Sequence, residues 1–315
     1  VAECARAALL AKADLNTNMV GEFPELQGIM GAYYARGDDE SPRVVEALAG
    51  QYRIRLEAPV KPDDLTATVL FMAERAETLV GIWGIGLAPT GERDPFGLRR
   101  AALGLISAFE QLTAGTVLNI QQDGPLTLHG LLQASADTFA VGALQADTVH
   151  EVQTFILERL RNQLITQYDR NAVEAVLALT PPLHQIPARV VAAEAFAQSP
   201  DAASLAAANK RIGNLLKKVE GTLPAVNTSL LTEPAEQALA QSIAALQPVA
   251  QKQFDLGDYK AALATLAQTR TAVDTFFNDI MVMAEDQAVR LNRLALLAQL
   301  HRLMNQVADI SRLAP

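Results

Sequence analysis

The stretch KADLNTNMVGEFPELQGIMG, residues 12–31, says most about how this chain folds. Its segment VGEFPELQG, residues 20–28, sets glycines, a proline and carboxylates among large apolar residues in an order that no amphipathic period explains. Gly21, Pro24 and Gly28 each break a helix or shape its end. We therefore expect a loop of fixed shape, in which Gly21 and Gly28 take backbone angles that other residues resist.

Outward from this stretch, the composition is that of a helical protein. The chain has 315 residues, of which only 5% are aromatic. Alanine and leucine dominate and runs of β-branched residues are scarce, which favours helices over strands. We predict an all-α protein that is long enough for two domains with cores of their own.

Charge and missing motifs exclude several classes of protein. A net charge of -9 argues against coating nucleic acid by bulk positive charge, so any RNA site must be a local basic patch. The single cysteine, Cys4, excludes a disulfide framework and fits a reducing compartment. No apolar run is long enough to span a membrane. Because no P-loop, nucleophile elbow or amino-acid-activating signature occurs, we expect no catalytic residue here.

A basic helical face is the best candidate for contact with RNA. We predict a helix over residues 201–219, with Ser199 as its N-cap and Pro200 as its first residue. At 100° per residue its apolar side chains fall on one side. The opposite side carries Lys210, Arg211, Asn214, Lys217 and Lys218. Such a face either binds phosphate groups or is an ordinary solvated surface.

Two further helices are predicted near the end of the chain. The first begins near Val273 and carries a stripe that includes Phe276 and Phe277, which is more typical of a core than of base stacking. The second covers residues 286–308 and is apolar on two sides, which indicates a central position in its bundle. Asn292 and Arg293 lie between its stripes, where they either bind RNA or satisfy buried carbonyl groups.

Four stretches in one order carry a resemblance to a known family. After residues 12–31 these are PTGERDPFGLRRAA (89–102), AAANKRI (206–212) and FFNDIMVMAED (276–286), the last continuing through RLNRL (290–294) and VADISRL (307–313). Together they resemble the β subunit of the two-subunit bacterial glycyl-tRNA synthetase across nearly the whole chain, although residues 113–147 match poorly. The chain begins within an apolar helical pattern, so we expect the C-terminal part of a longer protein.

The resemblance implies a domain order and a function. It implies an HD-like helical domain (1–112), a connector (113–147) and a helical, DALR-type anticodon-binding domain (148–315). The chain would position tRNA(Gly) for ATP-dependent glycylation by an α subunit, within a cytoplasmic α2β2 assembly. ATP and Mg²⁺ would be bound by that α subunit, and this chain would hold no cofactor. The tRNA contacts would come from the basic face, from Asn292 and Arg293, and from Arg93, Arg99 and Arg100.

The HD-like part departs from the pattern of a working phosphohydrolase. Such a site holds its metal with histidines and an adjacent aspartate, but none of the 4 histidines lies in the first 128 residues. Glu74 and Glu77 stand where the family has aspartates, and Asp14 is the only matching acid left. Glu92 likewise weakens a phosphate contact beside Arg93. We expect no metal site, and two alternatives stay open: a helical protein-interaction scaffold and a diverged HD phosphohydrolase.

Overall fold

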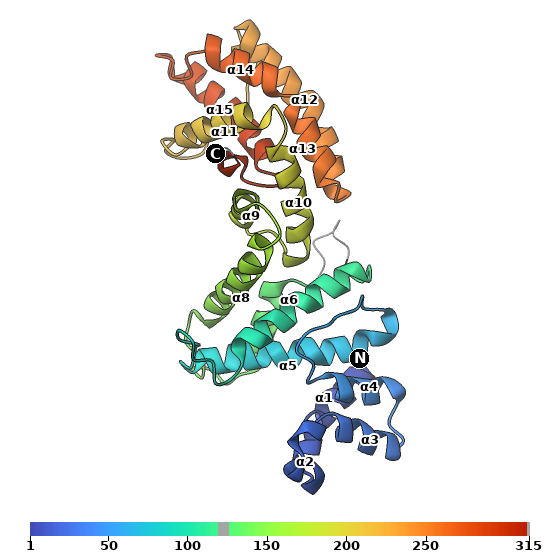
Figure 1. Ribbon diagram of the computed structural model, residues 1–315. Coiled ribbons are helices and arrows are strands. Elements are labelled where there is room, and N and C mark those ends of the chain that lie inside the picture. Colours follow the sequence, from blue (N-terminus) through green and yellow to red (C-terminus); the bar gives the residue numbers. More distant parts are fainter. Residues whose placement is uncertain (119–125, 314–315) are drawn as a thin grey trace. The chain divides into compact units, whose positions relative to one another are not determined.

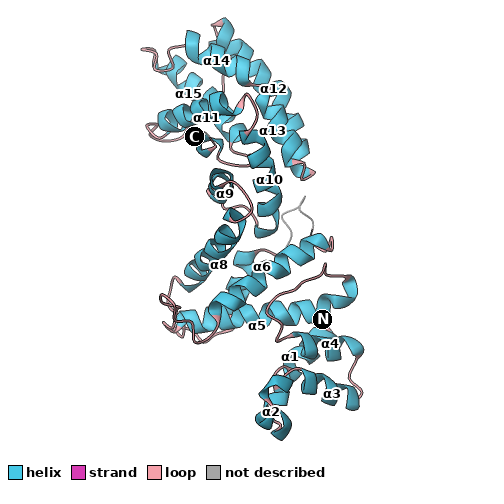
Figure 2. Cartoon of the chain, in the orientation of Figure 1, coloured by secondary structure: helices cyan, strands magenta, loops and turns pink. Residues whose placement is uncertain are grey.

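A computed structural model describes residues 1–118 and 126–313 and confirms the all-α prediction (Figure 1). Helices joined by loops make up this part of the chain (Figure 2). Its only strand-like contact is an isolated antiparallel bridge between Thr90 and Arg93. Among these residues, one compact unit comprises 1–118 and 126–162 and a second comprises 163–313. The predicted domain limits at 112 and 148 concern family units and stay a prediction.

The first unit is built around the long helix α5. Helices α1, α4, α6 and α7 all pack against it, and Phe71, Leu79, Leu105 and Phe109 are buried in the core that results. Helix α7 thus packs on this unit, although it lies in the predicted connector. The elements are α1 (Ala2–Leu10), η1 (Ala13–Asn16), α2 (Asn18–Glu22), η2 (Pro24–Leu26), α3 (Ile29–Gly37), α4 (Pro42–Gly50), η3 (Pro62–Asp64), α5 (Leu65–Gly84), α6 (Leu98–Ala114), α7 (Leu128–Ala136) and α8 (Thr148–Ile165), of which residues 163–165 are counted with the second unit.

The stretch 12–31 is a chain of short helical turns tied to one buried carboxylate. Thr17 caps α2, and Pro24 begins η2. Gly28 has φ +78°, as predicted, and its N–H donates to Oδ2 of the buried Asp14 at 2.6 Å. The expectation for Gly21 was wrong, because this residue lies inside α2 without a positive φ, and a Cβ on it would meet no other atom within 4 Å. One glycine rather than two therefore fixes the turn.

The second unit packs its helices around α15. This helix contacts both α11 and α12, and the side chains of Leu294, Leu297, Leu300 and Met304 are buried. The predicted central position of the last helix is confirmed, although the helix ends at Met304 rather than at 308. The elements are α9 (Arg170–Leu177), η4 (Leu183–Gln185), α10 (Ile186–Ala197), α11 (Ala202–Leu216), η5 (Thr228–Leu230), α12 (Pro234–Asp255), α13 (Tyr259–Ala267), α14 (Arg270–Asp279), α15 (Gln287–Met304) and η6 (Ile310–Arg312).

Candidate nucleic-acid interface

Helix α11 carries the predicted basic face and is anchored by its apolar stripe. Leu205, Ala208 and Ile212 are buried against the rest of the second unit, so the opposite face points to solvent. The predicted cap was wrong: the helix begins at Ala202 after Asp201, and Ser199 with Pro200 belongs to the preceding turn. The Ser199 carbonyl, rather than its hydroxyl, accepts from the Ala202 N–H at 3.2 Å. The helix therefore starts later than predicted and also ends earlier, at Leu216, so that Lys217 is its C-cap and Lys218 lies in the turn that follows.

All five side chains of the predicted face are exposed. They are Lys210, Arg211, Asn214, Lys217 and Lys218. None of the four cations forms an ion pair with a residue that the structure describes. The Arg211 guanidinium instead lies over the Phe277 ring, 4.3 Å from its centroid. A positive surface without ion-pair partners among the described residues is therefore available to an anion, even though the protein as a whole is acidic.

A groove of about 730 Å³ extends this face toward the end of the chain. Lys210 and Asn214 line it from α11, Lys217 lines it from the C-cap position just after that helix, and His301 lines it from α15. Arg312 lines it from η6. Sequence reasoning assigned no role to His301 or Arg312, because they lie far from α11 in the sequence and on other elements. The groove thus gathers charged and polar groups from three elements of one unit.

The two walls of the groove are joined by a pair of amides. Asn209 Nδ2 donates to Asn305 Oδ1 at 2.8 Å, and Asn305 Nδ2 donates back to Asn209 Oδ1 at 3.1 Å. Asn209 is 1% exposed. The Asp309 carboxylate accepts from the backbone N–H and the hydroxyl of Ser311 and pairs with Arg312 at 3.1 Å. Since its lone pairs are used within the wall, Asp309 holds Arg312 in place.

The His301 imidazole is a poor cation in this setting. Burial lowers its pKa below the ordinary value, and the nearby Asp309 carboxylate opposes this with a smaller effect. The ring is therefore largely neutral at pH 7 and offers one donor and one acceptor nitrogen. It contributes hydrogen bonding and a flat surface to the groove, whereas the charge comes from the lysines and from Arg312.

Asn292 and Arg293 are occupied inside the protein. Asn292 is 2% exposed and exchanges two hydrogen bonds with the backbone of Asn227, at 2.7 and 3.0 Å. Arg293 forms an ion pair with the fully buried Glu236 and donates to the Met281 carbonyl at 2.9 Å. Glu236 in turn accepts from the Glu233 N–H, which closes the cap of α12. These contacts favour the structural alternative for both residues.

The three arginines of the first unit do not act as one cluster. Asp94 accepts from the N–H groups of Leu98 and Arg99 at 2.8 and 2.9 Å and so caps α6. The Arg99 side chain donates to the Gly91 carbonyl and holds the turn that precedes this helix. Arg93 and Arg100 are exposed and have no ion-pair partner among the described residues. Of the three, these two are available to a phosphate group.

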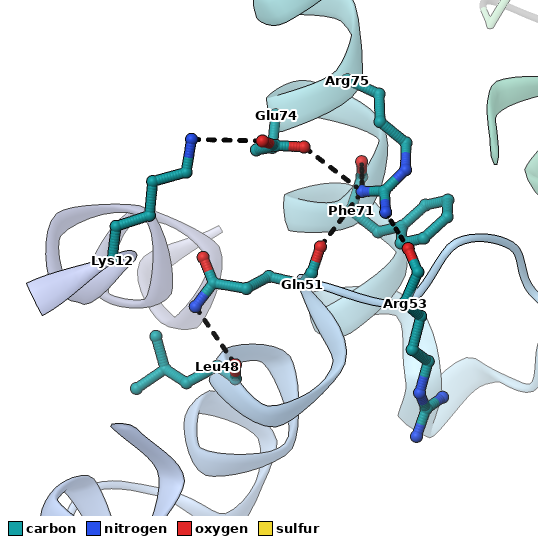
Figure 3. Close-up of polar contacts among 7 residues, drawn as sticks. All are labelled: Lys12, Leu48, Gln51, Arg53, Phe71, Glu74 and Arg75. Atoms are coloured by element: carbon teal, nitrogen blue, oxygen red, sulfur yellow. Dashed lines mark hydrogen bonds and ion pairs between the residues drawn. The ribbon is translucent and has the colours of Figure 1, made fainter. Parts of the chain in front are cut away.

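Two of the three acids at the HD-pattern positions, Asp14 and Glu74, have structural partners. Glu74 pairs with Lys12 at 3.1 Å and with Arg75 at 3.4 Å (Figure 3). Asp14 holds the N–H of Gly28. Within residues 1–118 and 126–313, no group of three or more His, Cys, Asp or Glu side chains is placed to hold a metal ion. The expectation of no metal site nevertheless stays a prediction.

Arg75 is the centre of the polar network in Figure 3. It donates to the carbonyls of Phe71 and Gln51 at 2.9 and 3.2 Å and to the carbonyl of Arg53, and it lies over the Phe71 ring. Burial lowers its pKa to about 10, partly opposed by Glu74. A Cβ on Gly104 would stand 2.5 Å from the Arg75 Nε. The glycine therefore makes room for a guanidinium that ties the 51–53 turn to α5.

Comparison with known proteins identifies the family. A family model described as the glycyl-tRNA synthetase beta subunit matches residues 1–178. The chain belongs to this family. A second model, the DALR anticodon binding domain, matches residues 205–311 of this glycyl-tRNA synthetase beta-subunit chain. That range contains the basic face and nearly all of the groove that it lines.

Two curated relatives show how much of a beta subunit this chain represents. The glycine–tRNA ligase beta subunit of Ralstonia nicotianae is 50% identical over 317 residues, which is 100% of this chain and 44% of that protein. The beta subunit of Neisseria gonorrhoeae is 46% identical over 313 residues, which is 99% of this chain and 44% of that protein. The chain thus spans less than half the length of these relatives. Family membership favours neither the scaffold nor the phosphohydrolase alternative.

None of the helices that the structure describes is both long enough and apolar enough to cross a lipid bilayer.

Proposed function

We propose that this chain binds tRNA(Gly) as part of the beta subunit of glycine–tRNA ligase, with the basic face of α11 supplying much of the affinity. The observation that carries the proposal is the position of that face. Four exposed cations without ion-pair partners among the described residues lie within the range that matches an anticodon-binding domain. Phosphate groups are the anions that such a face would meet in tRNA.

The chemistry of glycine attachment would belong to the α subunit. The sequence carries no P-loop or amino-acid-activating signature, and Asp14 and Glu74, which stand at positions of the HD pattern, have structural partners. On this proposal ATP and Mg²⁺ are bound by the α subunit in a cytoplasmic α2β2 assembly. The present chain accelerates the reaction only by holding the tRNA in position, which lowers the entropic part of the barrier.

Removing two lysines tests the proposal. Lys210→Ala with Lys217→Ala should weaken the binding of a tRNA(Gly) transcript and leave the melting temperature unchanged, because both side chains are exposed. The slope of log K against log salt concentration should become shallower by roughly 0.7–0.9 for each phosphate group that is no longer neutralised. Fluorescence anisotropy over a salt series measures both quantities.

A matched pair of lysines provides the control. Lys252 and Lys260 are also exposed in the second unit but lie on α12 and α13. Lys252→Ala with Lys260→Ala changes the net charge equally and should leave both affinity and salt slope near those of the parent. If the two double variants behave alike, affinity follows overall charge and the proposed face is only a solvated surface.

A further inference from the structure

The first unit contains a small cavity of its own. Its lining comes from the turn at residues 51–54, from α5 and from the beginning of α6. Its volume of about 180 Å³ is below the roughly 300–1,000 Å³ that is typical of sites enclosing a drug-sized ligand. The cavity therefore has room for one compact group, and the rest of any ligand has to lie at its rim.

Positive charge dominates the lining of this cavity. Arg53, Arg75 and Arg100 contribute three guanidinium groups, and Glu74 is the one carboxylate among the lining residues. Glu74 is already paired with Lys12 and with Arg75, and Arg75 also donates to three carbonyl groups. A group that enters the cavity therefore meets an excess of cations, which favours an anion.

Arg53 and Arg100 are the cations that remain for such an anion. Both are exposed, and neither side chain forms a hydrogen bond or an ion pair with a residue that the structure describes. The Arg53 side chain extends away from Arg75 (Figure 3). The Arg100 guanidinium packs against Gly97, where φ is +69° and a Cβ would stand 2.9 Å from the Arg100 Nη2. Because Gly97 itself lines the cavity, this glycine leaves room for the guanidinium at the cavity wall.

The rim of the cavity carries exposed apolar side chains. Phe96 and Ile54 both line it and are 46% and 58% exposed. Guanidinium groups bind phosphate with charged hydrogen bonds, and an exposed aromatic ring can stack on a nucleobase. A lone oxyanion would leave the ring of Phe96 in water. The ligand that uses the whole surface therefore has a flat apolar part as well as a phosphate group.

We propose that this cavity binds a free nucleoside monophosphate, with its phosphate at Arg53 and Arg100 and its base against the Phe96 ring. One phosphate group occupies both unpaired guanidinium groups, so a di- or triphosphate would find no further unpaired cation among the lining residues. The proposal does not rest on RNA binding, which concerns α11 in the second unit. It adds a second kind of ligand and no chemical step.

Three probes separate the two parts of the ligand. AMP should bind the 315-residue chain at least about 10-fold more tightly than adenosine or inorganic phosphate does, because each of these lacks one of the two contacts. Isothermal titration calorimetry without RNA measures all three affinities. A dissociation constant for AMP above about 1 mM, or one equal to that of inorganic phosphate, would overturn the proposal.

Substitutions at the wall and at the rim assign the contacts. Arg100→Gln should weaken the binding of AMP and of inorganic phosphate by roughly 10- to 150-fold, as the loss of hydrogen bonds from a charged group does. Adenosine binding should not change. Phe96→Ala should weaken AMP by roughly 5- to 150-fold, as the loss of one stacked base does, and should leave inorganic phosphate unchanged. Parent-like binding of AMP by either folded variant would overturn the proposal.

Further variants keep the test valid and provide its controls. Arg53→Gln replaces Arg100→Gln if the latter melts early, and Phe96→Leu likewise replaces Phe96→Ala. Arg55→Gln and Phe23→Ala change an exposed arginine and an exposed phenylalanine that do not line the cavity, so both should bind AMP as the parent does. Weakening by these controls equal to that at Arg100 and Phe96 would overturn the assignment to this cavity.

A tRNA(Gly) transcript distinguishes a free nucleotide from RNA as the source of the phosphate. Saturating transcript should leave bound AMP in place, and Lys210→Ala with Lys217→Ala should bind AMP as the parent does. Failure of AMP to bind would therefore leave the tRNA proposal intact. Displacement of AMP by the transcript would show that the cavity belongs to an RNA-binding surface and would overturn its assignment to a free nucleotide.

Discussion

The ion pair between Arg293 and Glu236 offers the sharpest test of which polar residues are structural. Glu236 has no exposed surface, and the Arg293 side chain is 11% exposed. Arg293→Met removes the charge, keeps much of the apolar stem and leaves the Glu236 carboxylate buried with the Glu233 N–H as its one partner among the residues that the structure describes. If Arg293 were instead an RNA contact, this substitution would affect binding and not folding.

The expected magnitude follows from the burial of the pair. Leaving one member of a buried ion pair without its partner costs about 3–5 kcal/mol. The Met281 carbonyl adds little, because the Met281 side chain is exposed and water can replace the missing donor. For a unit of this size the loss corresponds to a fall in melting temperature of roughly 6–20 °C. Urea unfolding followed by circular dichroism would give the free energy directly.

A double-mutant cycle shows whether the loss belongs to the pair. Glu236→Gln keeps an acceptor for the Glu233 N–H while removing the charge. The double variant with Arg293→Met should be more stable than the sum of the single losses predicts, by about 0.5–3 kcal/mol. A normal melting temperature for Arg293→Met together with weakened tRNA binding would refute the structural assignment and return Arg293 to the RNA-contact set.

Three further outcomes are expected. Gly28→Val should destabilise the protein by about 1–3 kcal/mol, because φ is +78° and a Cβ would stand 2.7 Å from the Tyr52 ring; an unchanged urea midpoint would show that the turn is loose. Gly104→Ala should cost about 1–3 kcal/mol by displacing Arg75, whereas Gly21→Ala, which has open space around it, should not destabilise; equal midpoints for the two would contradict this. Finally, the pKa of His301 in the folded protein lies below its ordinary value of 6.5. As the pH falls, the unfolded chain therefore protonates His301 at a higher pH than the folded protein does, and the free energy of unfolding decreases below about pH 6.5. His301→Gln should lack this component of the pH dependence, and identical slopes for variant and parent would exclude it.

The sequence predicted which faces of the helices are buried better than it predicted where the helices end. The two apolar stripes of the last helix are a property of its own residues, so its central position could be recognised in advance. Its end could not, because no glycine or proline marks it. The chain leaves the helix after Met304 so that Val307, Ala308 and Ile310 reach the core, and the Asp309 N–H bonds the Ala175 carbonyl at 2.8 Å. Contacts so distant in sequence leave no local pattern.

The candidate site shows the same division. Periodicity identified the exposed cations of α11, since they oppose its apolar stripe. It could not identify His301 or Arg312, because a helical period does not tell which elements will meet. One residue, Asn209, could have indicated that another element packs here, because it is a polar residue on the apolar side of α11. It is 1% exposed and therefore needs a buried hydrogen-bond partner, which is Asn305. For Asn292 and Arg293 the sequence left two roles open, and only the contacts with Asn227 and Glu236 favour one.

The amide pair between Asn209 and Asn305 has a consequence for how ionic strength acts on this surface. Hydrogen bonds between neutral amides are insensitive to screening, whereas interactions between exposed charges weaken as salt is added. The spacing of α11 and α15 should therefore be the same in dilute and in concentrated buffer. A salt titration of RNA binding would then count displaced counterions alone, without a change in groove width mixed into the slope. Because the Asn209–Asn305 pair carries no charge, the slope of a salt titration can be read directly as the number of phosphate contacts in the complex.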